Sequence, residues 1–193
     1  MEFATKCLHA GYSPKNGEPR VQPIVQSTTY TYDSAEEIGK LFDLQAAGYF
    51  YTRLANPTTN AAEEKITALE GGVATMCTAS GQSAVFYAML NILEAGDHFI
   101  SSSYVYGGTY NLFAHTFKKM GIEVTFVDQD LPLEELKKAI RPNTKAVFAE
   151  TIANPALRVL DIEKFAALAK AAEAPLLVDN TFACLLYTSD AAD

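Results

Sequence analysis

Three carboxylates each come directly after a run of apolar residues in this sequence: Asp128, Glu150 and Asp179. Such an acid can simply mark where a buried strand reaches water, which is our interpretation of Asp128. Asp179 differs because polar Asn180 and Thr181 extend the same edge. A carboxylate in that position could pair with a cationic ring nitrogen and hold it protonated.

A second candidate is the small-residue turn Ser80-Gly81-Gln82, which lies between an apolar run and a segment of helical spacing. A helix that begins here would present unpaired backbone N–H groups and the positive end of its dipole, which suits a phosphate. The alternative is structural: Ser80 caps the helix and Gly81 lets the backbone turn. The turn alone does not decide between the two interpretations.

Aromatic and basic side chains complete the candidate set. Tyr106 lies in a loop that follows an apolar run and opens a helix, so it could stack on a flat cofactor or form part of a rim. Arg53 offers forked donors that match a phosphate, and Tyr51 adds a hydroxyl; a surface salt bridge is the alternative for Arg53.

Composition excludes several classes of function. The 193 residues carry a net charge of -8, which argues against a nucleic-acid or anionic-membrane surface. No apolar run reaches the roughly 20 residues of a membrane span, and no secretory signal is visible at the start. Cys7, Cys77 and Cys184 have no disulfide or zinc spacing, so reduced thiols in the cytoplasm are expected.

The sequence lacks two kinds of pattern, and their absence limits the classes of ligand to be expected. Neither a GxGxxG fingerprint nor a GxxxxGK[ST] loop occurs, which argues against dinucleotide and nucleoside triphosphate sites. His9, His98 and His115 share no ligand or triad spacing, so we predict structural roles for them and no metal site.

From residue 60 onward, strands alternate with helices, which is typical of an α/β protein with a mostly parallel sheet. An acid, Asp130, is expected to cap the helix that follows it. Residues 1–60 are different, being rich in proline and in aromatic residues without period, and we interpret them as an arm that lies on a second subunit. The helix after Asp130 is expected to carry Leu133, Leu136 and Ile140 on one face. The other expected helices are 35–45, 61–70, 84–93, 108–119 and 161–172, and the expected strands are 73–77, 98–101, 122–127, 146–149 and 176–178.

Taken together, the motifs resemble those of the pyridoxal-phosphate enzymes of cysteine and methionine metabolism, the cystathionine γ-synthase-like family. The resemblance runs from about Leu8 to Thr181, nearly the whole chain. The motifs that carry it are Gln26-Ser27-Thr28-Thr29-Tyr30, Tyr51-Thr52-Arg53, Asn56-Pro57-Thr58, Ala79 to Ala84, Tyr106-Gly107-Gly108-Thr109, Glu150-Thr151, Asn154-Pro155 and Val178 to Thr181.

The resemblance implies a fold-type I, aspartate aminotransferase-like architecture and a site built by a dimer, usually within a tetramer. Ser80, Gly81 and Gln82 would hold the phosphate of pyridoxal 5′-phosphate, which Tyr51 and Arg53 would reach from the neighbouring subunit. Tyr106 would stack on the pyridine ring, Asp179 would pair with its nitrogen, Asn154 would lie at its phenolic oxygen, and Thr181 would lie nearby. Tyr106 and Tyr51 are also the implied catalytic residues.

Within the family, the motifs at 9–20 and 41–44 look most like those of the O-acetylhomoserine sulfhydrylases. The implied reaction belongs to methionine biosynthesis and transsulfuration: sulfide replaces the acetate of O-acetyl-L-homoserine, giving L-homocysteine and acetate. Cystathionine γ-synthase and methionine γ-lyase share these motifs and stay open as alternatives. An alternative from another class is a non-catalytic oligomerisation or binding module.

The sequence departs from the family pattern near its end. The family's Schiff-base lysine lies about two dozen residues beyond the Asp-Asn-Thr triplet, and none of the lysines here stands in its motif. Residues 184–193 do not continue the pattern, so we expect a non-native tail. The predicted organisation is therefore an arm at 1–60, the first part of the cofactor-binding large domain at 61–183, and the tail. As a fragment, the chain is expected to be inactive.

Overall fold

The computed structural model describes residues 2–185, which divide between Cys77 and Thr78 into two compact units. Helix α3 runs unbroken from Pro57 to Glu70 and belongs to the N-terminal unit, so this division lies after the predicted boundary at residue 60. The predicted division into domains stays a prediction. Residues 186–193, most of the predicted tail, lie outside the described residues.

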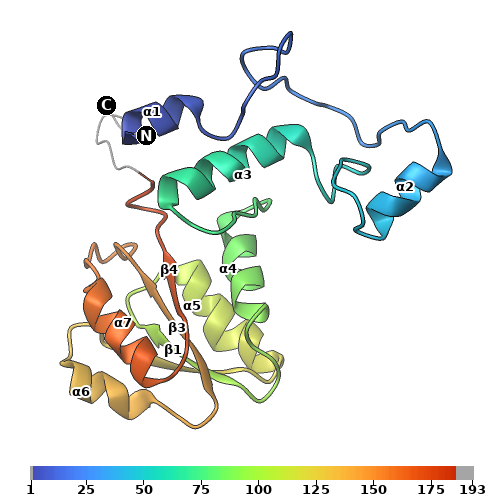
Figure 1. Ribbon diagram of the computed structural model, residues 1–193. Helices are drawn as coiled ribbons and strands as arrows, with labels where there is room; N and C mark the ends of the chain where they lie inside the picture. The colour runs from blue at the N-terminus through green and yellow to red at the C-terminus, as the bar shows by residue number, and fades with distance from the viewer. Residues whose placement is uncertain (1, 186–193) are drawn as a thin grey trace. The chain divides into compact units, whose positions relative to one another are not determined.

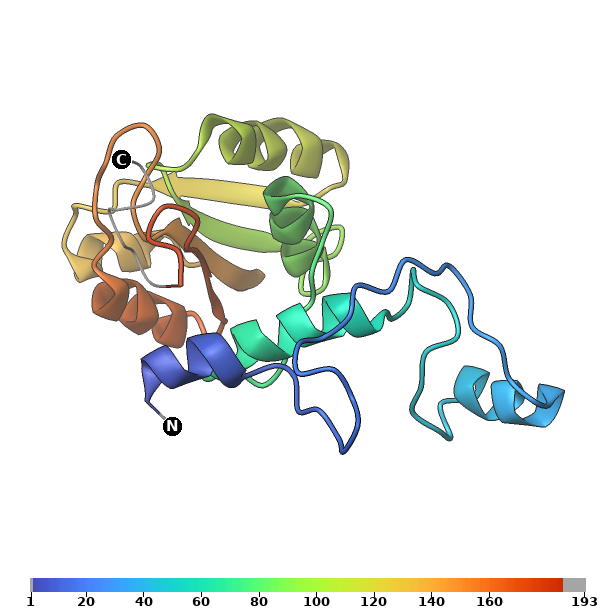
Figure 2. The same ribbon diagram turned by 90° about the horizontal axis from the view of Figure 1, so that it is seen from above.

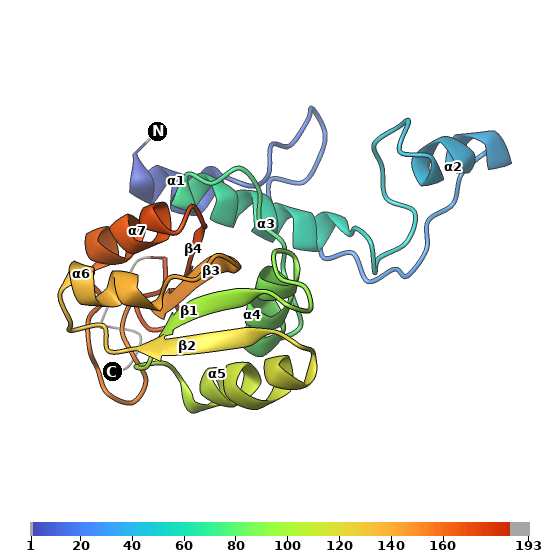
Figure 3. The same ribbon diagram turned by 90° about the horizontal axis from the view of Figure 1, so that it is seen from below.

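The C-terminal unit is built on a four-stranded parallel sheet of order β2-β1-β3-β4 (Figure 3). The central strands β1 and β3 are almost wholly buried, as strands covered on both faces must be. The register pairs Glu150 with Asp179 at the carboxyl ends of β3 and β4. The strands are β1 (His98–Ser102), β2 (Glu123–Val127), β3 (Thr144–Glu150) and β4 (Leu176–Asp179).

Helices cover both faces of this sheet (Figures 1 and 2). Helix α4, α5 and the π-helical turn η1 bury their apolar side chains on one face, and α6 and α7 bury theirs on the other. This confirms the predicted α/β architecture. None of the helices within residues 2–185 is both long and apolar enough to cross a membrane. The bounds are α4 (Gly81–Leu90), α5 (Gly107–Asn111), η1 (Leu112–Phe117), α6 (Leu133–Leu136), the 3-10 turn η2 (Lys137–Ala139) and α7 (Ile162–Ala171).

Aromatic side chains form the centre of the core on the α4 and α5 face. Phe113 is fully buried, and its ring centroid lies 4.9 Å from that of Phe99 and 5.0 Å from that of Phe148. Both pairs are edge to face, the geometry that aromatic quadrupoles favour. This cluster ties η1 to the two central strands, and so fixes the helix that begins just after Tyr106.

His98, predicted to be structural, begins β1 and is fully buried. Its two ring nitrogens lie 2.8 Å from the hydroxyls of Thr144 and Thr125. Burial, with Arg141 as a second cause and against the opposing effect of Glu123, lowers its pKa from 6.5 to about 4. The neutral ring is therefore part of the folded structure at neutral pH.

We expect this histidine to make the protein less stable in mild acid. Between pH 6.5 and 4 the unfolded chain binds a proton that the folded chain does not, so the free energy of unfolding falls as pH falls, by up to about 3 kcal/mol. Urea denaturation at several pH values should show the loss. Subtracting the free energy of unfolding of the His98→Gln variant from that of the wild type at each pH gives the contribution of His98. If the two free energies fell with pH by the same amount, this role of His98 would be refuted.

The N-terminal unit contains α1 (Phe3–His9), α2 (Ala35–Phe42) and α3 (Pro57–Glu70), with α1 packed on α3 (Figure 1). Among its described residues, Leu41 is the one buried hydrophobic side chain. The side chain of Asn56 caps α3 and donates to the carbonyl of Val25, which orders the preceding loop. So little burial agrees with an arm that packs poorly on itself, while its contact with a second subunit stays a prediction.

Two local predictions are wrong. Residues 73–77 form no strand in the described sheet: Val73 is fully exposed, and the N–H of Cys77 donates to the Glu63 carboxylate at 2.7 Å. Asp130 does not cap the next helix, which begins at Leu133 after Pro132. Proline suits a helix start because its φ is fixed and its missing N–H needs no partner. Asp130 pairs instead with Arg158 at 3.2 Å.

Candidate functional site

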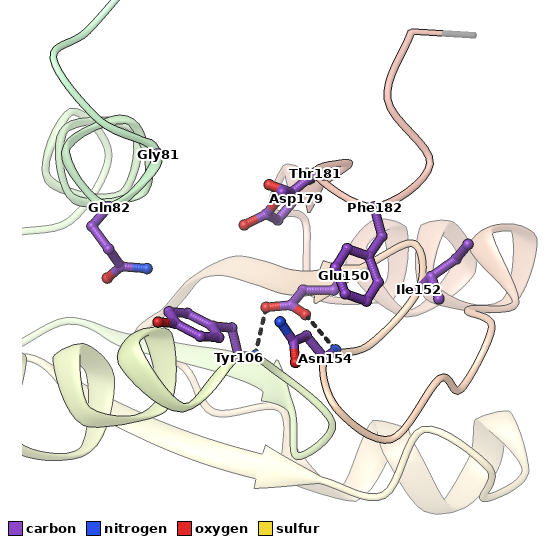
Figure 4. A pocket seen from close by; sticks show the side chains of 9 residues that line it. All are labelled: Gly81, Gln82, Tyr106, Glu150, Ile152, Asn154, Asp179, Thr181 and Phe182. Carbon is purple, nitrogen blue, oxygen red and sulfur yellow. Dashed lines mark hydrogen bonds between the residues drawn. The ribbon is translucent and has the colours of Figure 1, made fainter. Parts of the chain in front are cut away.

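A cavity of about 360 Å³ lies at the carboxyl edge of the sheet in the C-terminal unit (Figure 4). Its position, beyond the strand ends, is where open α/β sheets bind ligands, and its volume is within the range of small-molecule sites. Six of the predicted site residues are brought together here. The lining consists of Gly81, Gln82, Tyr106, Glu150, Ile152, Asn154, Asp179, Thr181 and Phe182.

The start of α4 forms one side of the cavity. Ser80 is the N-cap residue, and its hydroxyl accepts the N–H of Ser83 at 3.1 Å. Its predicted contact with a phosphate stays a prediction. The N–H groups of Gly81 and Gln82 lie in the first turn of α4, where no carbonyl of the helix can accept a hydrogen bond from them. They leave two donors and the positive helix end beside the cavity, which is the arrangement that binds a phosphate.

Tyr106 lies where β1 leads into α5, and the residue is 48% exposed. Its side chain lies against Gly108, where an added Cβ would come within 2.6 Å of the Tyr106 ring. On the other side, the amide of Gln82 donates to the buried hydroxyl of Thr109 at 3.0 Å, which ties the start of α4 to α5. The position of the Tyr106 ring is therefore set by α5 and by the start of α4.

We expect Gly108→Ala to displace the Tyr106 ring without unfolding the protein, because the clash is with a side chain that can rotate. Loss of an aromatic contact worth about 1 kcal/mol should weaken binding of pyridoxal phosphate about fivefold, measured by titration with the cofactor. Gly107→Ala is the matched control, since its added Cβ meets no atom within 4 Å. Equal cofactor affinities for the two variants would contradict this account of the ring.

Asp179 is the last residue of β4, and one of its carboxylate oxygens accepts two hydrogen bonds from within the protein. Oδ1 accepts the N–H of Thr181 at 2.9 Å and the hydroxyl of the same residue at 2.5 Å. Oδ2 makes no hydrogen bond with another side chain or backbone group in residues 2–185. Thr181 thus orients the carboxylate, and the second oxygen can accept from a protonated ring nitrogen.

Sequence reasoning named Glu150 as an acid at a strand end but gave it no specific role in the site. It is only 5% exposed, and it accepts the backbone N–H groups of Tyr106 at 2.7 Å and of Asn154 at 3.3 Å. Burial raises the pKa of its carboxyl; the two hydrogen bonds oppose this effect and Asp179 adds to it. The one sequence feature that could have indicated a role for Glu150 is its position at the end of a predicted strand, as Asp179 ends another. Ile152 and Phe182 also line the cavity and had no sequence signal.

Tyr51 and Arg53 belong to the N-terminal unit and line a different cavity there, of about 420 Å³. The guanidinium of Arg53 lies over the Tyr51 ring, 5.1 Å from its centroid. Their predicted role at a phosphate in a neighbouring subunit stays a prediction.

Comparisons with known proteins now identify the fold and the cofactor. Residues 4–190 match the family model described as Cys/Met metabolism PLP-dependent enzyme. The chain belongs to this family. Pyridoxal phosphate is the cofactor of the family, as the sequence motifs implied, and the fold is that of the fold-type I enzymes.

Three relatives illustrate the match. The chain is 48% identical over 178 residues to an O-acetyl-L-homoserine sulfhydrylase of Leptospira meyeri, covering 92% of this chain and 40% of that protein. It is 44% identical to an L-methionine gamma-lyase of Fusobacterium nucleatum subsp. polymorphum, covering 94% and 46%. The chain thus spans less than half the length of these curated relatives.

The third is a solved structure of a putative O-acetylhomoserine (thiol)-lyase from Campylobacter jejuni, which carries N′-pyridoxyl-lysine-5′-monophosphate. It superposes with a TM-score of 0.89 at 37% identity, covering 96% of this chain and 45% of that one. The cavity fits such a cofactor by its chemistry: unpaired N–H groups for the phosphate, an aromatic ring, and a carboxylate with an available oxygen.

Proposed function

We propose that this chain is the N-terminal part of an enzyme that converts O-acetyl-L-homoserine and sulfide into L-homocysteine and acetate. The observation that carries the proposal is the 48% identity to an O-acetyl-L-homoserine sulfhydrylase over nearly the whole chain. The gathering of six predicted cofactor residues in one cavity supports it, since a scaffold without catalysis would not need them as a set.

The residues of the cavity have separate tasks in this proposal. Bound pyridoxal phosphate supplies an electron-withdrawing ring that stabilises negative charge on the α carbon of an amino acid. Asp179 holds the proton on the ring nitrogen, and Thr181 keeps that carboxylate oriented. The start of α4 would hold the phosphate, the Tyr106 ring would stack on the pyridine ring, and Asn154 would lie at the phenolic oxygen. Tyr51 and Arg53 complete the phosphate site from a second subunit.

Methionine γ-lyase is the second candidate, favoured by 44% identity over 182 residues to such an enzyme. A full-length protein that contains this chain should be assayed with O-acetyl-L-homoserine plus sulfide and, separately, with L-methionine alone. Homocysteine from the first mixture supports the sulfhydrylase. Methanethiol and 2-oxobutanoate from the second, with no homocysteine from the first, would assign the lyase instead.

We also propose that the 193-residue chain has no turnover by itself. None of the residues that line the cavity is a lysine, so none of them offers an amine that could link to the cofactor there. The same assay on the isolated chain should yield no homocysteine above a protein-free control. Steady turnover by the isolated chain would show that one of its lysines serves the cofactor.

A further inference from the structure

Glu150 joins two loops that are far apart in the sequence. One loop follows β1 and carries Tyr106; the other follows β3 and carries Asn154. The carboxylate accepts the Tyr106 N–H on Oε1 at 2.7 Å and the Asn154 N–H on Oε2 at 3.3 Å (Figure 4). A single side chain therefore holds the backbone of two residues that line the cavity from opposite loops.

The geometry calls for a carboxylate. Both partners are backbone donors, and a carboxylate offers two acceptor oxygens and no donor, whereas a glutamine offers one acceptor and one donor. A glutamine could satisfy one of the two loops only, because its NH₂ group would face the other N–H.

The carboxylate is kept at an energetic cost. Glu150 is 5% exposed and makes no ion pair with any basic side chain in residues 2–185. Burial and the neighbouring charge of Asp179, its partner in the register of β3 and β4, both raise the pKa of its carboxyl. Since a buried charge without a cation opposes folding, its two backbone bonds must offset that cost.

We propose that Glu150 is a positioning residue, whose two backbone hydrogen bonds fix Tyr106 and Asn154 where the cofactor's ring meets them. It acts through these two residues and need not touch the cofactor itself. The inference rests on the family's cofactor and on this cavity, and it does not depend on which amino acid or sulfur donor the enzyme uses.

The first test is amide hydrogen exchange in the wild-type protein, which needs no variant. The Tyr106 amide should exchange at least about tenfold more slowly than that of Gly107, the first residue of α5, which has no partner within its helix. The same rate at both amides would overturn the proposal.

The second test uses Glu150→Gln. Exchange at Tyr106, Asn154 or both should become about tenfold faster, while strand amides of β1 and β3 keep their rates. Asp128→Asn is the matched control. Asp128 is an acid just beyond the carboxyl end of β2, its carboxylate accepts the Asp130 N–H at 3.0 Å, and it lies outside the cavity. Unchanged exchange at both loop amides in a folded Glu150→Gln protein would overturn the proposal.

A third readout separates positioning from simple stability. Titration of the full-length protein with pyridoxal phosphate should show about tenfold weaker binding for Glu150→Gln, and circular dichroism in the cofactor's absorption band should change per molecule bound. Asp128→Asn should match the wild type in both. A variant that only melts earlier, with wild-type affinity and the same dichroism, would mean that Glu150 has no positioning role. Neither signal involves O-acetylhomoserine or sulfide, so this test and the assignment of the reaction can fail independently.

Discussion

The Asp179→Asn variant should bind pyridoxal phosphate about 10- to 100-fold more weakly than the wild type, because a charge-assisted hydrogen bond is worth about 1.5–3 kcal/mol. Asparagine keeps an Oδ1 that can accept the N–H and hydroxyl of Thr181, so the strand end should hold its shape. What is lost is the negative oxygen that pairs with the ring nitrogen. Titration of each protein with the cofactor, followed by absorbance, measures the effect.

The control for this variant is again Asp128→Asn, which removes a charge at the same edge of the sheet but outside the cavity. Its affinity for the cofactor should equal that of the wild type. If the two variants bound equally well, general electrostatics would explain the result and the pairing role of Asp179 would be wrong.

Phe113→Ala should lower the free energy of unfolding by about 3–5 kcal/mol, the usual cost of truncating a fully buried phenylalanine. The ring lies between Phe99, Phe117 and Phe148, with centroid distances of 4.9, 5.5 and 5.0 Å. These neighbours come from two strands and from η1 itself, so they cannot all close over the space that is left. Urea denaturation gives the free energy.

A partly exposed aromatic residue of the neighbouring helix provides the comparison. Tyr110 is 44% exposed and stacks on Phe126 at 4.6 Å, so Tyr110→Ala should cost about 1 kcal/mol. A loss of similar size in both variants would show that the Phe113 cluster is not the centre of this core.

Periodicity predicted the sheet well because its central strands are buried on both faces. The four residues before Glu150, 146–149, are all apolar, and β3 lies in the interior of the described sheet. The carboxyl ends of parallel strands lie at one edge, so the gathering of Asp179 and Thr181 near the start of α4 could also be expected. The structure confirms that these residues share one cavity.

The predictions failed where a segment has the local pattern of a strand but no neighbouring strand to pair with. Residues 73–77 have the composition of a strand, yet they pair with no strand of the described sheet, and Val73 is exposed. Glu150 was harder to interpret, because its role depends on two backbone N–H groups, one of them 44 residues away. Backbone donors have no sequence signature, so only the structure shows which side chain holds them.

The most direct test of the cofactor site is an NMR titration of the ¹⁵N-labelled protein with 4-deoxypyridoxine 5′-phosphate, which lacks the aldehyde and cannot react with surface lysines. We predict saturable shift changes centred on the amides of Gly81 and Gln82 and on the Tyr106 loop, and much smaller changes at Gly81 and Gln82 with the unphosphorylated 4-deoxypyridoxine. Changes that cluster away from the carboxyl edge of the sheet, or that are the same without the phosphate, would contradict the assignment of this cavity to the cofactor.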